Sequence, residues 1–96
     1  MENDLVNGIQ TNDTQTLRVQ LNYPPDRVYQ PILAQLVTDY NLVPNIRRAD
    51  YDERNGGIIY LELSGEQSDL DRALLFLDAM SIEVNALPQA GENWVI

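Results

Sequence analysis

Cysteine, histidine and lysine are all absent from this chain of 96 residues, so its six cationic side chains are arginines. Without cysteine and histidine, the chain has no disulfides, no thiolate or imidazole metal ligands and no Cys–His or Ser–His nucleophile. Without lysine, it has neither Schiff-base chemistry nor the phosphate-binding lysine of a P-loop. We therefore expect a protein that is not an enzyme and that uses no cofactor.

Positive charge is also scarce, and the formal net charge is −9. Phosphate backbones and anionic lipids attract clustered cations, so this charge predicts no nucleic-acid partner and no attraction to a membrane surface. No apolar run approaches the ~20 residues of a membrane span, and the initial segment MENDLVNGIQ lacks the basic start and apolar stretch of a signal peptide. We expect a cytoplasmic protein without membrane insertion.

The residue pattern divides the chain into three segments. Residues 1–14 are polar and aperiodic, which predicts a flexible N-terminal segment. Residues 15–87 carry periodic apolar patterns and are expected to form one domain, since a chain of this size builds a single core. Residues 88–96 are a C-terminal tail, and its apolar end, Trp94-Val95-Ile96, is expected to fold back or to dock on another subunit.

The first half of the domain predicts a strand and a helix. Residues 15–22 alternate between apolar and polar side chains, as in a half-buried strand. The helix begins near Gln30, because Pro31 is tolerated in a first turn, and Asn41 can adopt the left-handed conformation that ends a helix. Five residues form its expected apolar face: Ile32, Leu33, Leu36, Val37 and Tyr40.

The second half predicts a hairpin, a helix and a last strand. The hairpin joins residues 43–54 to residues 58–63 through Asn55-Gly56-Gly57, which accept positive φ. Ser64 and Gln67 have the spacing of a capping box at the start of the helix. The helix buries Leu70, Ala73, Leu74, Leu77 and Met80, and the strand alternates at Ile82, Val84 and Ala86.

The order strand, helix, strand, strand, helix, strand predicts an α+β fold of ferredoxin-like βαββαβ type. Right-handed crossovers bring both helices to one face of a four-stranded antiparallel sheet and leave the other face open. Many unrelated activities use this fold, so the fold alone predicts no function.

A longer stretch around the hairpin is similar to a known family. It comprises Asn41-Leu42-Val43-Pro44-Asn45-Ile46-Arg47-Arg48-Ala49, then Gly56-Gly57, then Leu61-Glu62-Leu63-Ser64-Gly65. These residues resemble the NIL domain, which is named for an Asn-Ile-Leu run at its second strand. The similarity continues through residues 70–77 and 82–84, and it covers about residues 15 to 87.

The resemblance implies a regulatory domain. NIL domains typically lie at the C-terminus of the ATPase subunit of methionine-importing ABC transporters, where the domain pairs with its twin and binds methionine at the dimer interface. No ATPase precedes the domain in the chain as given, so we expect a stand-alone module whose output passes through a separate protein partner.

The resemblance also suggests ligand-binding residues, which are Asn45, Ile46, Arg47 and Ala49. The strand-leading Asn of the motif is Asn45, and its amide offers a donor and an acceptor to an amino acid. The alternative is that Asn45 only ends a loop by bonding to nearby backbone. Arg47 replaces the motif's Leu: either it lays its stem along the core edge with its head in water, or it makes a pocket for an anion.

The outward face of the sheet is expected to carry the dimer interface. In residues 58–63, Ile59, Leu61 and Leu63 should face the core, while Ile58, Tyr60 and Glu62 should face outward. We expect Ile46, Ile58 and Tyr60, interleaved with Arg18, Arg48 and Glu62, to form a mixed surface that a homodimer covers.

Two hypotheses for function follow. In the first, the chain is a regulatory module that binds methionine or a related amino acid across a homodimer boundary. In the second, it is a protein-interaction module that binds no metabolite. A calcium site near Asp50, Asp52 and Glu53 is rejected, because Asn55 and Leu61 stand where an EF-hand needs Gly and Glu.

Overall fold

Four strands form one antiparallel sheet in the computed structural model, which describes residues 14–89. They are β1 (Thr14–Tyr23), β2 (Val43–Asp52), β3 (Gly56–Glu66) and β4 (Glu83–Ala86). Their order across the sheet is β2-β3-β1-β4, so β2 and β4 form the edges. The predicted ferredoxin-like α+β fold is confirmed. The predictions for residues 1–13 and for Trp94-Val95-Ile96 lie outside the described residues.

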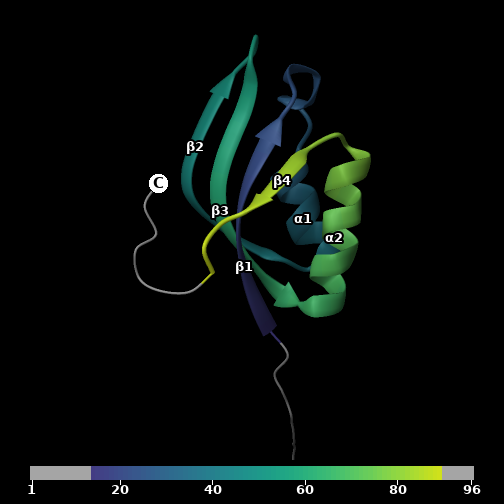
Figure 1. Ribbon diagram of the computed structural model, residues 1–96. Coiled ribbons are helices and arrows are strands. Elements are labelled where there is room, and N and C mark those ends of the chain that lie inside the picture. The colour runs from purple at the N-terminus through teal and green to yellow at the C-terminus, as the bar shows by residue number, and fades with distance from the viewer. Residues whose placement is uncertain (1–13, 90–96) are drawn as a thin grey trace, which may run out of the picture.

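Two α-helices, α1 (Ile32–Tyr40) and α2 (Gln67–Ala79), cover the same face of the sheet (Figure 1). A short 3-10 helix, η1 (Pro25–Arg27), connects β1 to α1. Asn41 ends α1 with a φ of 57°, as predicted, and its N–H donates to the carbonyl of Leu36. Among residues 14–89, no helix is long and apolar enough to cross a membrane.

The core lies between the sheet and the two helices. Its buried side chains come from α1, α2, β1 and β3 and from the loops that follow the two helices: Val19, Leu21, Tyr23, Ile32, Leu36, Leu42, Ile59, Leu61, Leu63, Leu70, Ala73, Leu77 and Ile82. The periodicity predicted most of these positions. Val37 was predicted to lie on the apolar face of α1, but its side chain is exposed.

The predicted capping box at Ser64 and Gln67 is wrong. The ladder between β1 and β3 continues to the pair of Thr14 and Glu66, so Ser64 belongs to β3 and its hydroxyl lies 3.0 Å from that of Thr16. Glu66 is the N-cap residue of α2, and its side chain makes no capping hydrogen bond. The amide of Gln67 donates instead to Asp71, one helical turn further on, at 2.9 Å.

The hairpin turn precedes its predicted position. Residues 53–55 form the turn, and Gly56 is already the first residue of β3, with a φ of 96°. A Cβ at Gly56 would overlap the carbonyl oxygen of Tyr23, so only glycine allows this close approach. The end of the hairpin therefore packs directly on the end of β1.

The edge formed by β4 is short, and beyond its end a side chain pairs with the backbone of β1. β4 pairs with β1 only from Val19 to Asn22. Beyond it, the N–H of Leu87 donates to the carbonyl of Arg18 at 3.0 Å. The amide of Gln89 then donates to the same carbonyl and accepts from the Arg18 N–H, both at 2.8 Å. The Gln89 side chain thus occupies the place of a further strand residue.

Candidate functional site

Strand β2 is the exposed edge of the sheet, and nine of its ten residues are exposed. Its pairing with β3 is interrupted by a bulge between Ile46 and Arg48, so the register between the two strands shifts at Arg47. A bulge adds one residue to one strand and so changes which side chains share a face. This irregularity decides where the predicted site residues lie.

The bulge separates the four predicted ligand-binding residues. Asn45 lies opposite Glu62 and so shares the open face of the sheet with it. Ile46 pairs with Leu61 and Ala49 with Ile59, so both belong to the helix-covered face. The prediction that Ile46 contributes to the open face is therefore wrong. It assumed that side chains alternate without interruption along β2, and the bulge adds one residue to that pattern.

Arg47 is exposed at the bulge. The alternative in which a buried arginine turns a core pocket into an anion site is wrong, since the added residue removes position 47 from the inward register. Its role in ligand binding stays a prediction.

A polar row crosses the open face from β2 to β1. The amide of Asn45 donates to one oxygen of Glu62 at 3.1 Å, and the Nε of Arg18 donates to the other oxygen at 3.3 Å. The side chains of Arg18 and Glu62 are only 20% and 19% exposed, so this ion pair is shielded more than an ordinary surface pair. The row places an amide, a carboxylate and a guanidinium side by side. Arg18 and Glu62 were predicted to lie on this face as part of the dimer surface, but their ion pair was not predicted, because only the register shows that they meet.

The predicted interface residues Ile58, Tyr60 and Arg48 all lie on the open face. Arg48 pairs with Tyr60, and its Nε lies 3.3 Å from a carboxylate oxygen of Asp50 on the same face. Because of the bulge, Asn45 and Arg48 are neighbours on this face although three positions separate them. The interface role of these residues stays a prediction.

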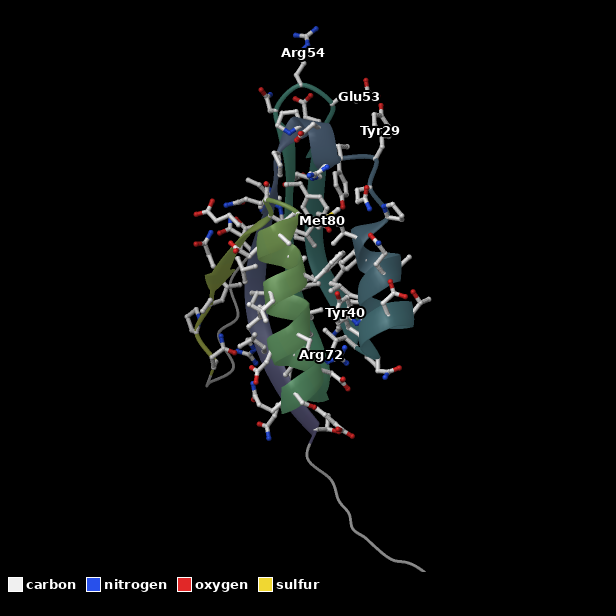
Figure 2. The ribbon with its side chains drawn as sticks, turned by 90° about the vertical axis from the view of Figure 1, so that its right-hand side faces the viewer. Tyr29, Tyr40, Glu53, Arg54, Arg72 and Met80 are labelled. Carbon is white, nitrogen blue, oxygen red and sulfur yellow. The ribbon has the colours of Figure 1, made fainter. Side chains whose placement is uncertain are left out.

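A second cluster at the hairpin end was not predicted from the sequence. The buried ring of Tyr23 packs edge-on against Tyr51, with 5.7 Å between ring centroids. Burial, and to a smaller extent the neighbouring Tyr51, raises the pKa of Tyr23. Figure 2 shows Tyr29 beside Glu53 at this end of the molecule, where the hydroxyl of Tyr29 donates to the Glu53 carboxylate. The ring contact joins the end of β1 to the hairpin, and the Tyr29 hydrogen bond joins the loop before α1 to it.

Comparison with known proteins relates the chain to a family and to a transporter subunit. The sequence model of the NIL domain family matches residues 17–86, more than two thirds of the 96 residues. The methionine import ATP-binding protein MetN 2 of Lactiplantibacillus plantarum is 32% identical over 72 residues. That match covers 72% of this chain and 21% of the relative, so the chain spans about a fifth of the relative's length.

The fold also resembles a solved structure. This is the crystal structure of the C-terminal domain of an ABC transporter ATP-binding protein from Enterococcus faecalis, with a TM-score of 0.66. The similarity covers 77% of this chain and 86% of that one. At 19% sequence identity, it concerns the fold alone.

Proposed function

Because the chain belongs to the NIL domain family, we propose that it is a non-catalytic regulatory module of methionine transport that binds methionine or a related amino acid at a homodimer boundary. The relative from Lactiplantibacillus plantarum is a methionine import protein, which supports this substrate class. The regulated ATPase would be a larger protein, since the domain corresponds to a fifth of that relative.

The position of Asn45 is the observation that carries the proposal. Its side chain is exposed on the open face of an edge strand, next to Arg48 and bonded to Glu62. An amino acid carries a carboxylate, which suits the amide and guanidinium donors, and an ammonium, which suits a carboxylate acceptor. This part of β2 therefore offers groups for both charges of the ligand.

The proposal is tested by the melting temperature of the full chain with and without L-methionine. At ~100 times its dissociation constant, a ligand adds ~2.7 kcal/mol and raises the melting temperature by several degrees. We expect Asn45→Ala to remove this rise. Asn85→Ala is the matched control, because Asn85 lies on the same face in β4 and bonds to Gln20 instead.

A rise that survives Asn45→Ala would reject Asn45 as a ligand residue. If none of the twenty amino acids moves the melting temperature, the regulatory proposal fails and the alternative gains support. In that alternative the chain is a protein-interaction module without a metabolite. The exposed apolar side chains of β2 favour it: Val43, Ile46 and Tyr51.

A further inference from the structure

The two edges of the sheet differ in what they offer to another chain. β4 has four residues and is followed by the Gln89 side chain, which occupies the backbone groups of Arg18. β2 has ten residues, and Val43 and Tyr51 on it are 66% and 51% exposed. An edge strand presents unpaired backbone N–H and C=O groups, so β2 is the place where a further strand can be added.

The sequence of β2 suits a second copy of itself. Arg47 and Arg48 are followed by Asp50 and Asp52, so the strand is basic in its middle and acidic at its end. In an antiparallel pair the two strands run in opposite directions, which brings the basic part of one strand to the acidic part of the other. A parallel pair would instead place like charges together, which destabilises a sheet.

The alternation of side chains restricts the possible registers. A two-fold axis perpendicular to the sheet keeps each side chain on its face, so residues that lie opposite each other in the two copies must share a face. Because successive side chains alternate between faces, this requires that one residue lies opposite its own copy on the axis. Centring the axis on Arg48 opposes two arginines, and centring it on Asp50 opposes two aspartates. Centring it on Tyr51 opposes Asp50 to Asp52.

Only a centre at Ala49 avoids like charges within the regular part of β2. It places Arg48 of each copy opposite Asp50 of the other, and both side chains lie on the open face. The small side chains of the two Ala49 residues then meet at the axis. The Arg48 and Asp50 side chains are 56% and 66% exposed, so their intramolecular pair can exchange partners between copies.

From this pattern we infer that two copies of the chain pair antiparallel through β2, with Ala49 on the two-fold axis and two Arg48–Asp50 ion pairs across it. Pro44, which has no N–H, and the bulge at Arg47 end regular pairing on one side. The pairing is therefore short and is centred on residues 48–50. This inference rests on the homodimer of the proposed function and names the contact that forms it.

The absence of cysteine allows a direct test by cross-linking. In an antiparallel pair, opposite Cα atoms are ~4.5–5.5 Å apart, which lies within the range that a disulfide spans. We expect Ala49→Cys to form a disulfide-linked dimer under mild oxidation. Val43→Cys is the matched control, because it is exposed on the same strand but lies six residues from the axis, and we expect it to stay uncross-linked.

A charge exchange provides a second test that does not depend on disulfide geometry. Arg48→Asp and Asp50→Arg should each weaken dimerisation about tenfold, because each opposes like charges twice. The double variant should restore it. Asp50→Arg lowers the net negative charge of each copy, so a weaker dimer in that variant cannot come from general repulsion.

Light scattering beside these tests distinguishes the β2 contact from dimerisation itself. A dimer in which Ala49→Cys cross-links no better than Val43→Cys, or in which the charge exchange has no effect, overturns the β2 contact and leaves the dimer of the proposed function standing. A chain that stays monomeric at all concentrations overturns both the contact and the dimer. Methionine binding is measured by the melting temperature of the unsubstituted chain, because Arg48 also belongs to the proposed ligand site.

Discussion

The ring of Tyr51 occupies the space in front of Gly57: a Cβ at position 57 would lie 2.6 Å from Cδ1 of that ring. Gly57 pairs with Tyr51 across the hairpin and with Tyr23 on its other side. Its missing side chain leaves room for the Tyr51 ring to reach Tyr23, so this aromatic contact helps to hold the far end of the hairpin to the core.

Replacing Gly57 by alanine should therefore destabilise the protein. The added methyl displaces the Tyr51 ring, and we expect the free energy of unfolding in urea to fall by about 1–3 kcal/mol. The control is the same change in a Tyr51→Ala background, where most of this cost should vanish because the ring is gone. An equal cost in both backgrounds would show that the methyl clashes with something else.

A substitution at Ser81 should stabilise the protein. Ser81 follows α2 with a φ of 64°, a left-handed conformation that costs a non-glycine residue free energy. We expect Ser81→Gly to raise the free energy of unfolding by about 0.5–1 kcal/mol. Asn41→Gly is the matched comparison, because Asn41 has a φ of 57° but tolerates it better, so its gain should be smaller. A loss of stability in Ser81→Gly would contradict this account.

Arg27 should stabilise the end of α2. Its Nε donates to the carbonyl of Met80 at 2.9 Å, at the C-terminal end of a helix that has no basic residue in its own last turn. Met80 marks this helix end in Figure 2. A cation here satisfies a terminal carbonyl and complements the helix dipole, so Arg27→Gln should lower the free energy of unfolding by about 0.5–2 kcal/mol.

Arg54 offers a control for Arg27. It lies at the exposed tip of the hairpin, away from both helices (Figure 2). Arg54→Gln removes the same charge, and its effect on stability should stay within about 0.5 kcal/mol. Equal losses in the two variants would indicate an effect of net charge and would reject the capping role of Arg27.

Tyr23 should make stability depend on alkaline pH. Burial raises its pKa above the ordinary value of 10.0. The unfolded chain therefore loses this proton near pH 10 while the folded chain keeps it, so the contribution is complete below pH 10 and is lost as the pH rises further. Between pH 9 and 11 the wild type should lose about 1 kcal/mol more than Tyr23→Phe.

Urea unfolding of both proteins at the two pH values measures this difference. The Tyr23 hydroxyl is buried and makes no hydrogen bond with a described residue, so Tyr23→Phe should cost little at pH 7. Tyr51→Phe is introduced into both proteins, because burial raises the pKa of Tyr51 and its contact with Tyr23 lowers it. Parallel pH profiles would show that Tyr23 ionises as easily in the folded chain as in the unfolded one.

The sequence predicted the fold because its elements have regular periods. The alternation in β1 and β3 and the left-handed Asn41 were predicted correctly, since each depends on residues close together in the chain. Ser64 was misassigned as a cap because its partner Thr16 lies 48 residues away. Competition between a local cap and a distant strand is visible only in the folded chain.

The candidate site was harder to predict for the same reason. Two-residue alternation predicts faces only while a strand is regular, and the bulge at Arg47 breaks it. Asn45 was found through family resemblance, but its bond to Glu62 follows from the register between β2 and β3. Arg48, on the far side of the bulge, was assigned to the correct face.

The Gln89 amide on the backbone of Arg18 has a consequence for assembly size. A sheet with two usable edges can add copies at both ends, and repeated addition produces a filament. In this chain the backbone groups of Arg18, just beyond the four residues of β4, already pair with the Gln89 amide, so among the described strands β2 is the longer edge for addition. Only the short strand β4 remains at the opposite edge, so one glutamine disfavours the repeated addition of copies there.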